Sequence, residues 1–145
     1  MQWTRVLSLA VLLALGGHAA WADDVTGSDR LLCAAVQATY CLEEGDCVID
    51  LPWNLNIPEF IEIDLIGRRL STTAASGSNR ATAIQHLSRQ DGTIVLQGFE
   101  MGRAFSFVIT EQTGQLSVAV AREGRVVAVF GACTPMPGAS TPGRE

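Results

Sequence analysis

Residues 80–133 read RATAIQHLSRQDGTIVLQGFEMGRAFSFVITEQTGQLSVAVAREGRVVAVFGAC. Apolar residues alternate with polar ones along this stretch, and turn sequences interrupt the alternation at intervals of roughly 8–12 residues. The pattern predicts short β-strands joined by tight turns, and the stretch ends in a cysteine. We expect strands over residues 82–90, 93–99, 103–110, 115–121 and 125–133.

The dipeptide Asp91-Gly92 is the strongest turn signal in the chain. Both central positions of a two-residue type I′ hairpin need positive φ, and Asp-Gly is a preferred pair there. If these two residues form the loop, Leu87 lies opposite Leu96 and Arg89 lies opposite Ile94. One face of the hairpin is then mostly apolar and the other mostly polar, as is typical of a half-buried antiparallel pair.

The residues upstream extend the same sheet. Alternating patterns predict strands over 59–65 and 69–73. Residues 31–41 could form a buried strand or a short helix, and the β-branched and aromatic residues near the end of this segment favour the strand. Two prolines, Pro52 and Pro58, exclude a central strand or a helix interior between them.

These segments together predict the fold class. The sequence indicates a single all-β domain over residues 31–133, with seven or eight strands in an antiparallel meander. A long open meander leaves exposed edges that can pair with other chains. We therefore expect the sheet to close into a small barrel or sandwich, and we expect the protein to be a monomer.

The N-terminal 22 residues have the layout of a secretory signal peptide. Arg5 precedes an apolar run over 6–17, and Ala20-Trp21-Ala22 supplies the small residues of a cleavage site. This run is shorter than the ~20 residues that a membrane-spanning helix needs. We expect cleavage after Ala22, a periplasmic or secreted protein, and no membrane contact after cleavage. A polar, unstructured lead-in over 23–30 and a disordered tail over 134–145 are expected to flank the domain.

All four cysteines lie in the part of the chain that follows the predicted signal peptide. An even number of cysteines in a small exported chain predicts two disulfides, and the close spacing typical of a structural zinc site is absent. Three pairings are possible. We favour Cys41 with Cys47 across an acidic turn, and Cys33 with Cys133 between the first and last strands, which must meet if the meander closes.

Charge argues against one class of partner. The formal net charge is −5, and loss of Arg5 with the signal peptide makes it −6. An acidic chain with no basic run binds phosphate backbones poorly, so we expect no nucleic-acid partner. Every basic residue is arginine, which we attribute to compositional bias, although arginine suits carboxylate and phosphate ligands.

The sequence offers no convincing catalytic constellation. His86 is the one histidine beyond the predicted signal peptide, and the hairpin register places it on the polar face of a strand. A catalytic triad would need a nucleophile and an acid beside it, and no G-x-S-x-G motif is present. We therefore expect no catalytic residue, no metal site and no cofactor, and we interpret the protein as non-enzymatic.

Two loops are candidate binding sites. Trp53 lies between prolines, and we expect it to pack on the core, with an exposed anchor for a partner as the alternative. The segment 76–80 is made of small, polar residues and ends in an arginine, so Ser76, Asn79 and Arg80 could enter the cleft of a partner. The simpler interpretation of this segment is a long hairpin connection.

The chain contains the motifs Leu31-Leu32-Cys33, Cys41, Cys47, residues 70–73, Leu96-Gln97-Gly98, residues 102–106 and residues 129–133. Together they resemble the motifs of a family of small exported proteins found in proteobacteria, a resemblance that implies no activity. Ala75-Ser76-Gly77 is similar to a loop of the periplasmic lysozyme-inhibitor barrels, in which a Ser-Gly loop plugs the cleft of the enzyme; the Tyr-x-Cys start of those barrels is absent.

Three functions remain open on this basis. The first is a non-enzymatic domain that binds or inhibits another protein. The second is a binder of a small apolar ligand that uses the barrel interior, which would require a cavity of roughly several hundred Å³ lined by residues such as Phe105 and Leu116. A hydrolase that uses His86 is the third. The unknown partner is thus a protein or a small molecule.

Overall fold

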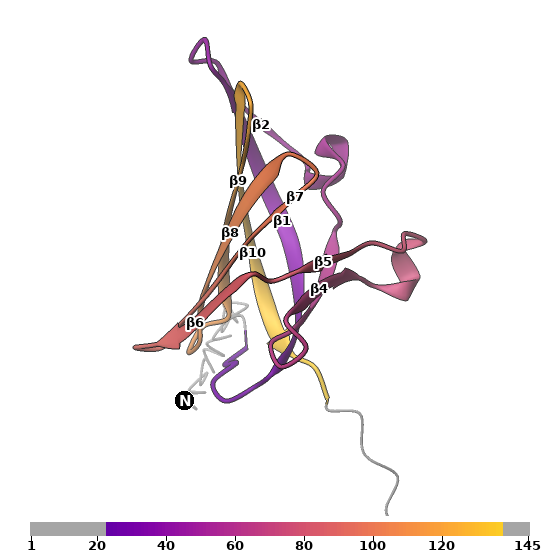
Figure 1. Ribbon diagram of the computed structural model, residues 1–145, viewed down its shortest axis with the longest axis vertical. Coiled ribbons are helices and arrows are strands. Elements are labelled where there is room, and N and C mark those ends of the chain that lie inside the picture. Colours follow the sequence, from indigo (N-terminus) through magenta and orange to yellow (C-terminus); the bar gives the residue numbers. More distant parts are fainter. Residues whose placement is uncertain (1–22, 138–145) are drawn as a thin grey trace, which may run out of the picture.

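The computed structural model describes residues 23–137. Within them the protein is all-β, and ten strands form one antiparallel sheet that curls into a half-barrel (Figure 1). The signal peptide predicted for 1–22 and the tail beyond 137 lie outside the described residues. The strands are β1 (Arg30–Leu42), β2 (Cys47–Asp50), β3 (Phe60–Asp64), β4 (Arg69–Thr72), β5 (Ala81–Ala83), β6 (His86–Gln90), β7 (Thr93–Glu100), β8 (Arg103–Thr110), β9 (Gln115–Arg122) and β10 (Arg125–Pro135).

The strand order confirms the predicted all-β class and corrects the finer expectation. Neighbouring strands follow the order β5-β4-β3-β1-β10-β9-β8-β7-β6, and β2 pairs with β1 off this path. The prediction of seven or eight strands was too low, because residues 47–50 form β2 and residues 82–90 divide between β5 and β6. The predicted closure was also wrong, since the sheet is a half-barrel and not a closed barrel.

The two edges of the half-barrel are formed by β5 and β6. These consecutive strands lie at opposite ends of the sheet order, and only Ile84 and Gln85 separate them. The Ile84 N–H donates to Arg68 O at 2.9 Å, whereas the Gln85 N–H donates to Gln97 O at 2.9 Å. The chain thus passes from one edge of the sheet to the other edge within two residues. Among residues 23–137, β5 and β6 do not pair with each other.

The hairpin of β6 and β7 has the predicted register. Leu87 lies opposite Leu96 and Arg89 lies opposite Ile94. Asp91 and Gly92 have φ values of 52° and 71°, the left-handed conformations that this two-residue turn requires.

Residues 31–41 belong to strand β1, as predicted, and this strand lies in the middle of the sheet. It pairs with β10 on one side and with β2 and β3 on the other. A β-bulge between Ala35 and Gln37 shifts the register with β10, and Gly131 lies opposite Ala35. Strand β10 extends to Pro135, so the first residues of the predicted tail belong to the sheet.

The lead-in is held in place, contrary to the expectation that it is unstructured. Val25 is fully buried, and its N–H donates to Glu111 O at 2.8 Å. Glu111 is itself buried, and its carboxylate accepts a hydrogen bond of 2.7 Å from Arg89 Nε. The Arg89 guanidinium also reaches Ser28 O at 3.1 Å, so one arginine ties the lead-in to β6.

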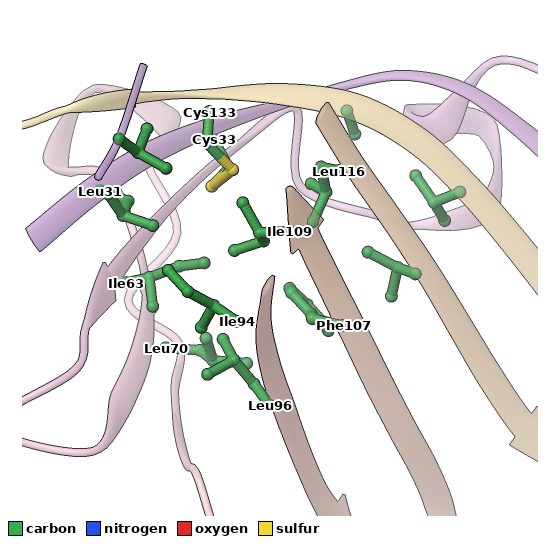
Figure 2. Close-up of a cluster of buried hydrophobic side chains, with 14 of the residues drawn as sticks. Leu31, Cys33, Ile63, Leu70, Ile94, Leu96, Phe107, Ile109, Leu116 and Cys133 are labelled. Carbon is green, nitrogen blue, oxygen red and sulfur yellow. A yellow bond between two sulfur atoms is a disulfide. The ribbon is translucent and has the colours of Figure 1, made fainter. Parts of the chain in front are cut away.

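The core is a cluster of buried hydrophobic side chains. They come from alternate positions of the strands, and Figure 2 shows them packed together with the disulfide between Cys33 and Cys133 at one side of the cluster. Cys33 bonds to Cys133, and Cys41 bonds to Cys47, so both predicted pairings are confirmed. The largest fully buried side chains include Leu31, Ile63, Ile94, Leu96 and Ile109.

Candidate functional site

The concave face of the sheet borders a half-open cavity of about 430 Å³ beside the core. Phe107, Leu116 and Val129 are buried side chains that line it on the side of the core, next to Cys33. Phe105, Val120 and Val127 also line the cavity and are only partly buried. Most of the lining is therefore apolar.

Strand periodicity explains why these side chains share one face. Successive residues of a strand point to opposite faces, so residues at i, i+2 and i+4 line the same face. On β8 this places Phe105 and Phe107 inside, and the two rings meet edge to face at 5.8 Å. The same alternation on β9 and β10 adds Leu116, Val118, Val120, Val127 and Val129.

A short 3₁₀ helix and the residues after it cover another side of the cavity. The helix η1 (Pro52–Leu55) is followed by Ile57 and Pro58, which line the cavity together with Leu55. Asp50 organises the start of this segment, because its Oδ1 accepts hydrogen bonds of 2.7 Å from Asn54 Nδ2 and from the Leu51 N–H. These hydrogen bonds, chiefly the one from Asn54, lower the pKa of the Asp50 carboxyl below its usual value.

Charged residues lie at the rim, where the apolar lining ends. Arg80, Arg103, Arg122 and Arg125 all line the cavity, together with Glu100. Glu100 Oε2 accepts a hydrogen bond of 2.6 Å from Thr82 Oγ1, which links β7 to β5 across the open side of the half-barrel. Within residues 23–137, none of the four arginines has a carboxylate oxygen within 4.0 Å.

The structure separates the residues that the sequence grouped as binding candidates. Arg80 lines the cavity, and its Nη1 donates to Asn56 O at 3.4 Å. Ser76 and Asn79 are exposed and lie outside the cavity lining. Trp53 is 53 % exposed, so the expected packing of this residue on the core does not occur.

His86 lies opposite Gln97 on the outer face, as the register predicted. It is exposed, and no side-chain hydrogen bond to it is found in the described part of the chain.

Residues 23–137 contain no group of three His, Cys, Asp or Glu side chains that could hold a metal ion. No helix between residues 23 and 137 is long and apolar enough to cross a membrane.

Sequence reasoning named only one residue of the cavity rim as a binding candidate. Phe105 and Leu116 were identified as markers of a ligand cavity, but Arg103, Arg122 and Arg125 were not singled out because they flank turns, where charged residues are common. The sequence did contain an indication of their position. Each arginine is an even number of residues away from the inward-facing residues of its own strand, so its side chain points to the same face.

Neither the family models nor the curated proteins contain a match to this chain.

Proposed function

We propose that this protein binds a small, largely apolar molecule inside its half-barrel. The observation that carries the proposal is the cavity of about 430 Å³, which is lined by Phe105 and Leu116. Ligand pockets are typically ~300–1,000 Å³, mostly apolar, with a few polar groups that fix orientation. The cavity meets these criteria, and the large side chains Phe105 and Phe107 line its wall without filling it.

The rest of the molecule is consistent with a binding role. One disulfide joins β1 to β10 in the middle of the sheet, and the other joins β1 to β2 across the turn between them, so the frame of the cavity is rigid. Rigid, preformed pockets bind a ligand with little loss of conformational entropy. The predicted signal peptide and the two disulfides within residues 23–137 together favour an exported protein in an oxidising compartment. Binding in this cavity requires no reaction, so the protein would act without catalysis.

Filling the cavity tests the proposal. Val120→Trp is expected to weaken binding of the uncharged fluorophore N-phenyl-1-naphthylamine by roughly tenfold or more, because the indole occupies the space that an apolar ligand needs. Fluorescence titration measures the dissociation constant, and displacement by dodecanol confirms that the fluorophore occupies the same site as an alkyl chain.

Val108→Trp is the matched control for this variant. Val108 lies on the neighbouring strand β8, is 40 % exposed and does not line the cavity. We expect this variant to bind the fluorophore as the unchanged protein does. The proposal is contradicted if the unchanged protein does not bind the fluorophore, or if both valine variants weaken binding equally.

A second candidate function is recognition of a protein by the loop over residues 73–80. The loop is internally organised: Ser76 Oγ donates to Thr73 O at 2.7 Å, Thr72 Oγ1 donates to Ser78 O at 2.7 Å, and the Arg80 N–H donates to Thr72 Oγ1 at 3.1 Å. An exposed loop held in one conformation can enter a cleft at low entropic cost. The resemblance of Ala75-Ser76-Gly77 to an inhibitor loop favours the same interpretation.

Capture of a partner from a periplasmic extract tests this second candidate. The Ser76→Ala/Asn79→Ala variant alters the exposed tip of the loop and leaves the cavity lining unchanged. We expect the unchanged protein to retain a partner that this variant loses. If the variant captures the same partner to the same extent, the loop is not the recognition site.

A further inference from the structure

We propose that the ligand of this cavity is an anionic amphiphile, with an alkyl chain among the apolar side chains and a carboxylate or phosphate head at the arginine rim. This inference rests on the proposed function, because it concerns the same cavity. It adds the chemical class of the ligand and the residues that select it.

Three of the rim arginines form a row across neighbouring strands. Arg125 lies directly opposite Arg122 in the pairing of β10 with β9. Ala104 lies opposite Ala121 in the pairing of β8 with β9, which places Arg103 beside Arg122 at the next position. All three arginines line the cavity, so their side chains share the concave face at one end of the half-barrel.

Such a row is unfavourable in the absence of a ligand. Like charges directly opposite each other on a sheet are destabilising, and a sequence selected for stability alone would place opposite charges there. The nearest carboxylate in the register, Glu100, lies opposite Arg103 but is engaged by Thr82. Among residues 23–137, no carboxylate oxygen lies within 4.0 Å of any of the three guanidinium groups.

The fourth arginine adds a donor from another side of the cavity. Arg80 precedes β5 and lines the same cavity, beside Asn54 and Asn56 of the covering segment. Arg125 is held near Tyr40, with its guanidinium carbon 5.8 Å from the ring centroid. Guanidinium groups match carboxylate and phosphate oxygens in planar, two-pronged contacts.

The volume of the cavity favours a single chain of moderate length. If a methylene group takes about the volume of a water molecule in the liquid, roughly 30 Å³, a cavity of about 430 Å³ has room for about fourteen such groups, so a twelve-carbon chain fits inside it. We therefore choose twelve-carbon probes that differ only in their heads.

Titration calorimetry on the disulfide-bonded chain from residue 23 onwards tests the inference with dodecanoate, dodecyl phosphate, dodecanol and dodecyltrimethylammonium. Both anions are expected to bind at least about tenfold more tightly than the neutral alcohol, as charge-assisted hydrogen bonds predict. Their affinity is also expected to fall as salt is added, because exposed charges are screened. The anion that binds more tightly identifies the head group as a carboxylate or a phosphate.

The Arg103→Gln/Arg122→Gln variant assigns the effect to the rim. We expect it to bind dodecanoate about tenfold more weakly and dodecanol unchanged. Its thermal stability without ligand is expected to equal or exceed that of the unchanged protein, because like-charge repulsion is removed. Arg69→Gln is the control, since Arg69 is exposed and outside the cavity lining and its replacement changes the net charge in the same direction.

The outcomes separate this inference from the proposed function. The inference of an anionic head group is overturned if dodecanol and dodecanoate bind equally well, or if the rim variant weakens the binding of both equally. In either case the apolar cavity remains a binding site. Tightest binding of dodecyltrimethylammonium also overturns the inference. Failure of all four probes to bind overturns the proposed function as well.

Discussion

Replacing Cys33 and Cys133 together with alanine is expected to lower the free energy of unfolding by roughly 5 kcal/mol. The two cysteines are 100 residues apart in the sequence, so their bond removes a large loop-closure entropy from the unfolded chain. Both side chains are also buried, and the alanines leave space in the core. A domain of this size has a total stability of about 5–15 kcal/mol, so most of it would be lost. Urea unfolding followed by circular dichroism measures the change.

The second disulfide provides the comparison. Cys41 and Cys47 are 6 residues apart, and the chain-entropy relation gives a contribution of roughly 2 kcal/mol for a loop of that length. The Cys41→Ala/Cys47→Ala variant should therefore unfold at a higher urea concentration than the Cys33→Ala/Cys133→Ala variant. If the two double variants are equally stable, loop length does not determine what these bonds contribute.

Gly131→Ala is expected to destabilise the protein by about 3 kcal/mol or more, although it adds a single methyl group. A Cβ at this position would lie 2.0 Å from Ala34 O and 3.0 Å from the Ala34 carbonyl carbon. Both are backbone atoms of β1, at the start of the bulge that shifts the register with β10. Relief of the clash requires the two central strands to separate, and thermal unfolding measures the cost.

Gly98→Ala is the matched control for this substitution. A Cβ at Gly98 would lie 2.3 Å from Phe105 Cζ, the end of a side chain that can rotate towards the cavity, and 3.0 Å from Ala83 O. We expect a smaller loss, about 1 kcal/mol. Equal losses from the two glycine variants would contradict the assignment of the larger effect to the backbone of the bulge.

The half-barrel relates stability to binding in a specific way. The disulfide between Cys33 and Cys133 and the bulge near Gly131 both act on the pairing of β1 with β10, in the middle of the sheet. The arginine row and most of the apolar lining lie on β8, β9 and β10. Arg103 and Arg122 lie on β8 and β9, outside the pairing of β1 with β10, which is why binding and stability can be tested separately.

Local chemistry made the hairpins predictable from sequence. The register of β6 with β7 follows from Asp91-Gly92, because the φ requirement of two turn residues determines which residues lie opposite each other. The first strand was predictable from residue type. The pairing of Cys33 with Cys133 was predicted from a closure of the sheet that does not occur, and the bond forms because β1 and β10 pair in the middle of the sheet. The sequence did not predict β2 or the division between β5 and β6, since short edge strands depend on neighbours distant in the chain.

The candidate site was predictable only in part. Alternation along a strand indicates which of its residues face inward, and it places Phe105, Leu116 and Val118 on the inner face of the sheet. This information comes from each strand separately. Whether that face is filled or hollow depends on how strongly the whole sheet curls and on where the covering segment after η1 lies. Arg80 was named as a binding residue in a loop, and its position at the cavity depends on the same tertiary arrangement.

By itself, the sequence determined the all-β class, the inner and outer faces and the hairpin register, because these follow from residue type and spacing along short segments. It favoured the observed disulfide pairs but left three pairings possible. The tertiary structure alone decided that the barrel stays open, that a cavity remains beside the core, and that Arg103, Arg122 and Arg125 stand in one row. The physical reason is that strand period and turn geometry act over a few residues, whereas curl, cavity volume and the approach of like charges arise from the packing of strands that are distant in sequence.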